Sequence, residues 1–236
     1  MVQRMKITVV GASGLIGTKV VELLRNEGHD VIASSRSSGV DVLIGDGLAD
    51  ALAGADALVD VTNSPSFEPG SVMEFFTTAA TNLVDAARRA GAGHYVALSI
   101  VGVDGLPDSG YFRAKVAQEK IISESGIPYS IVRATQFAEF AGAITESMTI
   151  GDEVRVPDAL IQPILGDQVA SAVARAAVGT PLNGIVNVGG PQKITFEQMA
   201  RDALVRKGDD TKTIVVDSEA RYFGAALNTD SLVVPD

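Results

Sequence analysis

Short apolar runs rich in β-branched residues alternate, along the first half of the chain, with longer segments that have apolar residues at helical spacing. The short runs predict buried strands over 5–10, 31–36, 40–44, 57–61, 94–99 and 127–133. The longer segments predict helices over 18–25, 72–90 and 111–119. Strands that alternate with helices through short connections are typical of a parallel sheet with helices on both faces, so we predict a doubly wound α/β fold.

The pattern is less regular beyond residue 136. A helix is predicted over 137–148, short strands over 154–157 and 161–164, and a further helix from Asp167, whose carboxylate is suited to cap it. No linker, internal repeat or low-complexity tract separates these elements from the earlier ones. We therefore predict a single domain over residues 1–236.

A glycine-rich turn joins the first predicted strand to the first predicted helix. Gly11, Gly14 and Gly17 are spaced as G-x-x-G-x-x-G, and a strand before such a turn with a helix after it predicts dinucleotide binding. Gly11 permits a tight turn, Gly14 lets a pyrophosphate approach the backbone, and Gly17 lets the helix lie close to the strand. The helix N-terminus offers N–H groups to the phosphates, and Ser13 can add a hydroxyl donor. The alternative is an ordinary structural turn, for which glycine is equally suited.

The second predicted strand ends in Ser34, Ser35 and Arg36. In dinucleotide-binding folds an acidic residue about 20 residues beyond the glycine turn holds the ribose hydroxyls of NAD. A carboxylate would repel a 2′-phosphate, whereas arginine and serine bind one through charge and hydrogen bonds. This substitution favours NADP(H) over NAD(H), and the alternative is a solvated arginine in a surface loop.

Composition excludes several classes of site and partner. The chain has no Cys and only two His, so disulfides, thiolate catalysis and a metal site of Cys or clustered His are not expected. The formal net charge of −10, with no basic patch in the sequence, argues against nucleic-acid binding. No apolar run has the length of a membrane span or the form of a signal peptide, so we expect a cytoplasmic protein without membrane contact.

A possible catalytic group follows the strand predicted over 94–99. Ser99 ends that strand, and Tyr111 and Lys115 lie four residues apart, so both project from one face of the predicted helix. A nearby ammonium and a cationic cofactor favour the ionised form of a phenol, and Tyr111 could then deliver a proton to a carbonyl oxygen. Ser99 would hydrogen-bond that oxygen. In the alternative, Tyr111 packs against the protein and Lys115 is solvated; both stay open because Tyr111 directly follows Gly110 at the helix start.

These motifs together resemble the short-chain dehydrogenase/reductase superfamily. The glycine turn over 11–17, and Ser99 followed by Tyr111-x-x-x-Lys115, are similar to its nucleotide-binding and catalytic motifs. Further similarity to its extended and NmrA-like members lies over 81–88, 164–170, 183–191 and 195–199. Ala134 departs from the pattern, because members of the superfamily usually carry a Pro there. The chain is identified as a member of the atypical, NmrA-like NAD(P)H-binding group, whose members commonly keep the Lys and lack the Tyr.

The resemblance implies a Rossmann-type fold with its nucleotide-binding part over about residues 1–150 and a small C-terminal substrate lobe over about 151–236. It also implies that Lys115 holds ribose hydroxyls of the cofactor. Asp46 would lie beside the adenine, or cap the following short helix, and the two roles are compatible. The residues expected to bind cofactor are Gly11, Ser13, Gly14, Leu15, Ile16, Gly17, Ser34, Ser35, Arg36, Asp46, Gly47, Thr62, Asn63, Leu98, Lys115, Ala134, Thr135, Gln136 and Phe137.

The predicted function is NADPH-dependent reduction of a small apolar carbonyl, quinone or enone by hydride transfer, in a monomer or homodimer. A non-catalytic NADP(H)-binding redox sensor is the alternative, since some NmrA-like members act in that way. A sugar-nucleotide epimerase or dehydratase is disfavoured, because the C-terminal part is short and poor in Arg for a second diphosphate. Candidates for the walls of a substrate pocket are Phe137, Phe140, Gln162 and Tyr222.

Overall fold

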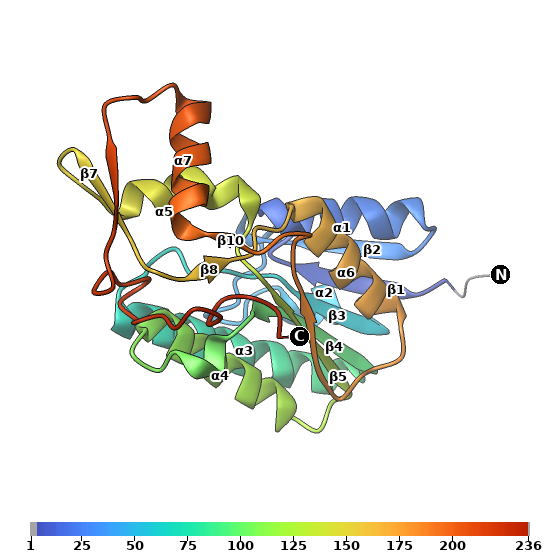
Figure 1. The fold of residues 1–236 in the computed structure, drawn as a ribbon. Helices are drawn as coiled ribbons and strands as arrows, with labels where there is room; N and C mark the ends of the chain where they lie inside the picture. The colour runs from blue at the N-terminus through green and yellow to red at the C-terminus, as the bar shows by residue number, and fades with distance from the viewer. Residues whose placement is uncertain (1–3, 236) are drawn as a thin grey trace.

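A six-stranded parallel sheet forms the centre of the molecule in the computed structural model, which describes residues 4–235 (Figure 1). Its strand order is β2-β1-β3-β4-β5-β9. The strands are β1 (Lys6–Val10), β2 (Asp30–Ser34), β3 (Ala57–Asp60), β4 (His94–Ile100), β5 (Tyr129–Ala134) and β9 (Gly184–Val188). Every neighbouring pair in this sheet is parallel, which confirms the predicted doubly wound Rossmann-type fold.

Helices cover both faces of the sheet (Figure 1). They are α1 (Leu15–Asn26) and α6 (Gly166–Val178) on one face, and α3 (Pro69–Ala90) and α4 (Gly110–Ser123) on the other, with α2 (Leu48–Leu52) beside α3. Because side chains alternate along a strand, Ile7 and Val9 of β1 pack with α1 and α6, whereas Val10 packs with α3. The apolar strand runs seen in the sequence are therefore buried from two sides.

The direction in which strands are added to the sheet reverses at β1, which has β2 on one side and β3 on the other. In open parallel sheets, ligands bind outside the carboxyl ends of the strands at such a reversal. Gly11 follows β1 and Val61 follows β3, and a Cβ atom added to Gly11 would lie 2.7 Å from the carbonyl oxygen of Val61. The fold therefore places the glycine turn at the reversal.

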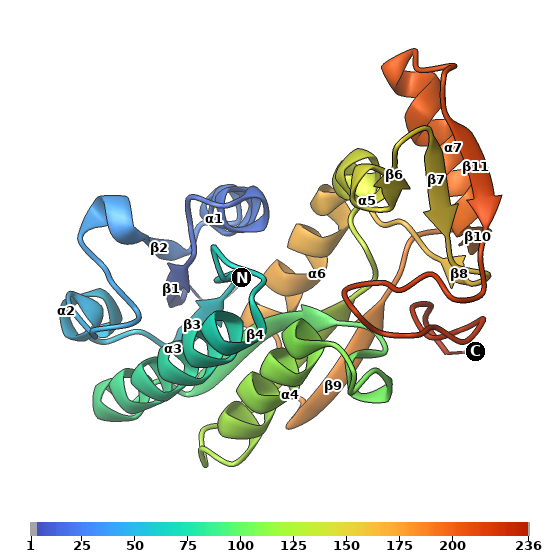
Figure 2. The same ribbon diagram turned by 90° about the vertical axis from the view of Figure 1, so that its left-hand side faces the viewer.

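A smaller lobe follows β5 and lies beyond the large sheet (Figure 2). Its elements are α5 (Ala141–Ser147), β6 (Thr149–Ile150), β7 (Glu153–Val156), β8 (Leu160–Ile161), β10 (Ile194–Thr195), α7 (Phe196–Lys207) and β11 (Thr213–Val216). The strands form one sheet in the order β11-β7-β6 and one β10-β8 pair. Phe112 of α4 shares a buried cluster with Ile161, Phe196 and Leu232, so the lobe packs directly on α4.

The C-terminal half returns to the large sheet after building part of the lobe. Both α6 and β9 lie beyond residue 150, yet α6 packs on the sheet and β9 pairs with β5 at its edge. The stretch 183–191, which the sequence left without a secondary-structure assignment, thus supplies the sixth strand. These two elements therefore follow the expected boundary near residue 150 and yet belong to the part built around the large sheet.

The predicted strand over 40–44 is wrong, and that segment is a turn. Val40 and Val42 are buried, as a strand pattern requires, but Gly39 and Gly45 on either side have positive φ angles of 84° and 82°. The Asp41 side chain accepts the Leu43 N–H at 2.8 Å, which closes the turn locally. An apolar run can therefore be buried without pairing in a sheet.

Two predicted helix caps are also wrong. Gly47, with a φ of 73°, is the N-cap of α2, and Asp46 lies exposed before it. Leu165 is the N-cap of α6, while Asp167 lies within the first turn and forms an ion pair with Lys19. Ser109 is the N-cap of α4, because its hydroxyl accepts the Phe112 N–H at the start of that helix.

The longest described helix, α3, is amphipathic over its 22 residues. Phe76, Ala79 and Leu83 are fully buried along its inner face, and the Asn82 amide donates to the carbonyl oxygens of Val42 and Leu43. Asn82 therefore bonds the backbone of the turn over 40–44. Within residues 4–235, no helix is both long and apolar enough to cross a membrane.

Candidate functional site

The glycine turn is fastened to the end of β2 and packed tightly under α1. The N–H groups of Gly11 and Ala12 donate to the carbonyl oxygen of Ser34 at 3.0 and 3.1 Å. Gly11 has a φ of 87°, which L side chains rarely adopt. A Cβ atom on Gly17 would lie 2.1 Å from the carbonyl oxygen of Gly11, so only glycine allows α1 to approach the turn this closely.

The N-terminus of α1 is suited to receive an anion. Its N-cap, Gly14, makes no side-chain cap, and no acidic residue lies in the first turn. The first helical bond runs from the Thr18 N–H to the Gly14 oxygen at 3.1 Å, so the N–H groups of Leu15, Ile16 and Gly17 precede it. Such N–H groups together with the helix dipole bind phosphates, so this turn fits the pyrophosphate of a dinucleotide.

The end of β2 lies beside this turn. Ser34 is buried, and a short 3₁₀ helix begins at Arg36, which is exposed. The Ser35 and Ser37 hydroxyls are hydrogen-bonded to each other at 2.8 Å. Arg36 Nε lies 3.8 Å from Asp41 Oδ2, and an exposed ion pair of this length contributes little stability, so it does not hold the guanidinium in place.

Asp60, the last residue of β3, joins the crevice to α4 through a buried hydrogen-bond network. One of its oxygens accepts the Tyr95 hydroxyl at 3.0 Å and the Gln118 amide at 2.9 Å. The other accepts the Thr62 N–H and hydroxyl at 3.0 and 2.7 Å. The carboxylate is 1% exposed, and these bonds fix both the loop at Thr62–Asn63 and the facing side of α4.

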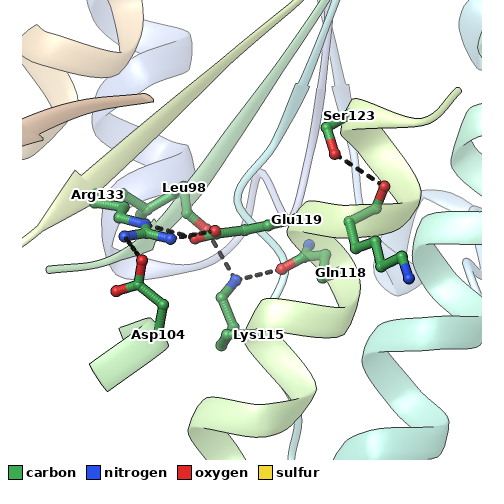
Figure 3. A network of polar contacts seen from close by, with 8 residues as sticks. Leu98, Asp104, Lys115, Gln118, Glu119, Ser123 and Arg133 are labelled. Atoms are coloured by element: carbon green, nitrogen blue, oxygen red, sulfur yellow. Dashed lines mark hydrogen bonds and ion pairs between the residues drawn. The ribbon is translucent and has the colours of Figure 1, made fainter. Parts of the chain in front are cut away.

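Lys115 belongs to the same network and is only 3% exposed (Figure 3). Its ammonium donates to the Leu98 carbonyl oxygen at 2.9 Å and to the Gln118 side-chain oxygen. Burial lowers the pKa of Lys115 to about 8, although the carboxylates of Asp60 and Glu119 act in the opposite direction. The side chain is therefore a buried cation held by the sheet, and the alternative of a solvated Lys115 is wrong.

Tyr111 lies in the first turn of α4, as its motif predicted, and its hydroxyl faces the loop after β3. The hydroxyl donates to Asn63 Oδ1 at 2.8 Å. Burial raises the pKa of Tyr111 to about 12, so the phenol keeps its proton over the physiological range. The prediction that Lys115 and the cofactor together favour the ionised phenol stays a prediction; in this structure burial acts in the opposite direction, and the ammonium bonds the Leu98 carbonyl oxygen.

An aromatic cluster surrounds the Tyr111 ring and comes from three separate segments. The centroid of the Tyr111 ring lies 5.5 Å from the ring centroid of Phe67, 5.8 Å from that of Phe76, 6.0 Å from that of Phe112 and 5.6 Å from that of Phe223. Phe76 and Phe112 are buried, whereas Phe67 is 56% exposed and Phe223 is 42% exposed. The phenol therefore lies on an apolar, partly open surface.

Two buried polar side chains near the strand ends have no hydrogen-bond partner among residues 4–235. They are Ser99, whose hydroxyl is unpaired, and Gln136, whose amide oxygen and nitrogen are both unpaired. Ser99 points to the α3–α4 face of the sheet, since Tyr95 and Ala97, which alternate with it, pack on that face. Buried polar groups without partners are rare and costly, so a bound ligand is a reasonable source of the missing bonds.

The other residues expected after β5 are held in the core. Ala134 is 2% exposed and Thr135 1%, and the Thr135 hydroxyl donates to the Gln162 carbonyl oxygen. Phe137 is partly buried, packs against the core on the α1–α6 face and stacks on Phe140 with ring centroids 5.7 Å apart. The Gln162 amide donates to the Gly190 oxygen and accepts the Val234 N–H, so this side chain fastens the C-terminal segment.

Sequence reasoning missed the ion pairs that hold the loop before α4. Arg133 donates to both oxygens of Glu119, at 3.0 and 2.6 Å, and lies 3.0 Å from Asp104 in that loop (Figure 3). Glu119, Gln118 and Lys115 are all buried on one side of α4. Their three- and four-residue spacing was the available signal, because polar residues at positions facing a core must find partners there.

The parallel sheet, the glycine turn at its reversal and the uncapped helix define a Rossmann-type nucleotide-binding protein. The NAD(P)H-binding family model matches residues 11–178, and the chain belongs to that family. Within it, the chain is an atypical short-chain dehydrogenase/reductase of the NmrA-like group, as its motifs predicted. Binding of NAD(P)H is therefore a property of its family, and the family is oxidoreductase-like.

Curated relatives are distant. The photosystem II assembly factor Ycf39 of Cyanophora paradoxa is 25% identical over 165 residues, which are 62% of this chain and 51% of that protein. An uncharacterized chloroplastic protein of Arabidopsis thaliana is 28% identical over 213 residues, covering 75% of this chain and 73% of that protein. The chain thus spans about half the length of the assembly factor that it matches.

Solved structures with similar folds include NAD(P)-dependent enzymes. MoeE5 in complex with UDP-glucose and NAD has a TM-score of 0.71 at 19% identity, covering 89% of this chain and 85% of its own. A dTDP-4-dehydrorhamnose reductase from Bacillus anthracis in complex with NADP also has a TM-score of 0.71, at 16% identity, covering 96% and 88%. At such low identity these similarities concern the fold alone.

Proposed function

We propose that the protein reduces a small apolar carbonyl, quinone or enone with NADPH as the hydride donor. The observation that carries this proposal is the Tyr111 hydroxyl, which lies 2.8 Å from Asn63 at the carboxyl edge of the sheet, within an aromatic surface. The site thus offers a protonated phenol in apolar surroundings, beside the loops at which a doubly wound sheet binds its nucleotide.

Tyr111 acts as the proton donor in this proposal. When bound, NADPH supplies a hydride from its nicotinamide ring. With a carbonyl substrate, Tyr111 would donate its proton to the oxygen as negative charge develops there, and the phenolate would be reprotonated from solvent. With a pKa of about 12 the phenol is protonated beforehand. The alkoxide that would form from an aldehyde or ketone is a stronger base than the phenolate, so the proton would pass to it. Ser99, whose hydroxyl is unpaired, would donate a second hydrogen bond to the developing oxyanion.

Cofactor binding is assigned in this proposal to the glycine turn and the strand ends. The N–H groups of Leu15 to Gly17 would hold the pyrophosphate, and Arg36 with Ser35 would hold the 2′-phosphate. The unpaired Gln136 amide would bond the nicotinamide side. Lys115 would reach ribose hydroxyls only by exchanging its bond to Leu98. The remaining predicted contacts are Gly11, Ser13, Gly14, Ser34, Asp46, Gly47, Thr62, Asn63, Ala134, Thr135 and Phe137.

A second candidate is a redox sensor that binds NADP(H) without turnover. The observation that favours it is the placement of Lys115, whose ammonium bonds Leu98 and Gln118 instead of lying beside the Tyr111 hydroxyl. Two of the distant relatives are named as assembly factors, which is a function without a named reaction. This candidate predicts tight cofactor binding with no turnover.

The deciding experiment follows NADPH oxidation by the purified protein with menadione, hexanal and cyclohexenone as acceptors. Steady turnover with any of them is expected, and Tyr111→Phe should lower kcat by roughly 10²- to 10⁴-fold while the Kd for NADPH stays unchanged. The control is Tyr129→Phe, which removes a phenol hydroxyl at the amino end of β5, away from the carboxyl edge of the sheet. This variant should leave kcat unchanged. NADPH binding without turnover of any acceptor would overturn the reductase in favour of the sensor.

A further inference from the structure

The sequence did not single out Phe223, yet its ring covers Tyr111. The two rings are stacked, with centroids 5.6 Å apart and planes 25° from parallel. Phe223 also lies 5.4 Å from Phe67, which in turn lies 5.5 Å from Tyr111. These three rings come from the β3–α3 loop, the first turn of α4 and the C-terminal segment, so residues far apart in the chain form one surface.

A tight two-residue turn holds Phe223 in this position. The N–H of Tyr222 donates to the Ala225 oxygen at 2.9 Å, and the N–H of Ala225 donates back at 3.0 Å. Phe223 and Gly224, at the tip, have φ angles of 47° and 82°. Tyr222 and Ala225 are buried beneath, at 6% and 1% exposure, so the turn is anchored while its tip ring remains at the surface.

The conformation of Phe223 is unfavourable for a bulky side chain. A positive φ is readily adopted by glycine and by asparagine, whereas for an aromatic residue it is a strained outlier. Stability alone would therefore favour another residue at this tip. Backbone strain of this kind persists mainly at ligand-contacting positions, and here the strained residue stacks on the phenol already assigned to proton transfer.

We propose that Phe223, with Phe67, is the specificity-determining wall of the substrate site, and that it selects a neutral, planar aromatic carbonyl compound of the quinone class. This inference rests on the proposed function, because it takes Tyr111 as the proton donor. The ring plane of Phe223 offers a flat substrate a stacking face beside the Tyr111 hydroxyl. All rings of the cluster are uncharged and the chain carries a net charge of −10, so an anionic substrate would be disfavoured.

The test compares Phe223→Asn with the wild-type protein, using menadione as the planar probe and hexanal as the aliphatic one. Asparagine keeps the positive φ and removes the ring, so the variant should fold at least as stably as the wild type. The KM for menadione should rise at least tenfold, the KM for hexanal should change less than twofold, and the Kd for NADPH should not change. Phe223→Tyr, which restores a ring, should recover menadione binding.

Binding is also measured without turnover. The chain has no Trp and four Tyr, so quenching of tyrosine emission by menadione in the NADP⁺-loaded protein measures its binding. Phe223→Asn should weaken this Kd at least tenfold, while Val205→Asn, a change at an exposed apolar position on α7, should not. Menadione binding that is equal in Phe223→Asn and wild type would overturn the inference. Menadione binding that depends on the Phe223 ring, but without turnover of any acceptor, would overturn the proposed reductase activity alone.

Discussion

At the scale of single residues, the proposed function assigns the choice of cofactor to Arg36 and the proton to Tyr111. The Arg36 guanidinium is exposed at the end of β2, and its contact with Asp41 is long and solvated. Because arginine binds a phosphate through several donors, Arg36→Ala should weaken NADPH binding at least tenfold, about 1.4 kcal/mol, and leave NADH binding unchanged. Titration of both cofactors by nucleotide fluorescence measures this, with Arg206→Ala on α7 as the control. Equal affinity of the wild-type protein for NADPH and NADH would contradict the assignment.

Lys115 should make stability depend on pH in the alkaline range. Its pKa is about 8 in the folded protein against 10.5 for the free side chain, because burial disfavours the charged form. Between these values the unfolded chain binds more protons, so the free energy of unfolding rises with pH. Relative to Lys115→Met, the wild type should gain about 3 kcal/mol from below pH 8 to above pH 10.5. Parallel unfolding curves for the two proteins across this range would refute the low pKa.

At the scale of elements, two glycines of the turn between β1 and α1 differ in role: Gly14 in the proposed binding of the cofactor, and Gly17 in the packing of α1. A Cβ atom at Gly14 would meet only the Gly11 oxygen, at 3.3 Å, whereas one at Gly17 would lie 2.1 Å from it. Gly14→Val should therefore fold but lose NADPH binding, because its branches occupy the approach of the pyrophosphate. Gly17→Ala should lower the free energy of unfolding by about 1–3 kcal/mol or more through overpacking.

Thermal unfolding and NADPH titration separate these two effects. Gly142→Ala on α5 is the control, since a Cβ atom there meets nothing within 4 Å and alanine is the better helix former. If Gly14→Val bound NADPH as the wild type does, the turn would serve the fold alone.

Helix α4 is the element that connects the parts of the site. Its first turn carries Tyr111, and its buried side carries Lys115, Gln118 and Glu119, which bond β4, β3 and β5 respectively through Leu98, Asp60 and Arg133. Its apolar residue Phe112 meets the C-terminal lobe. A shift of this one helix would therefore move the phenol, the buried cation and the lobe together.

At the scale of the whole molecule, the site is assembled from segments that the chain separates widely. Asn63 and Phe67 follow β3, Tyr111 lies in the first turn of α4, and Phe223 comes from the C-terminal segment. That segment is fastened beneath the site by Gln162, which binds the backbone of Val234. In the proposed site, the C-terminal segment would supply a substrate wall, and the glycine turn of the large sheet would bind the phosphates.

The sequence by itself determined the strands β1 to β5 of the sheet, the glycine turn and the helix that carries Tyr111 and Lys115, whereas the edge strand β9 was not predicted. Those features follow from local patterns of apolar residues and glycine spacing, because burial on two faces and a tight turn each restrict residue type over a short stretch. The same reasoning failed at 40–44, where Val40 and Val42 are buried without strand pairing. A hydrophobic pattern reports that a residue is buried and does not report what covers it.

The tertiary structure alone decided the partners of the polar and aromatic residues. Lys115 bonds Leu98, Asp60 gathers four hydrogen bonds, and Phe223 stacks on Tyr111, although 112 positions separate those two rings in the chain numbering. Contacts of this kind depend on how helices and loops meet across the sheet. The hydrophobic periodicity of a segment does not specify such contacts, because the pattern would be the same if the residue contacted a different partner.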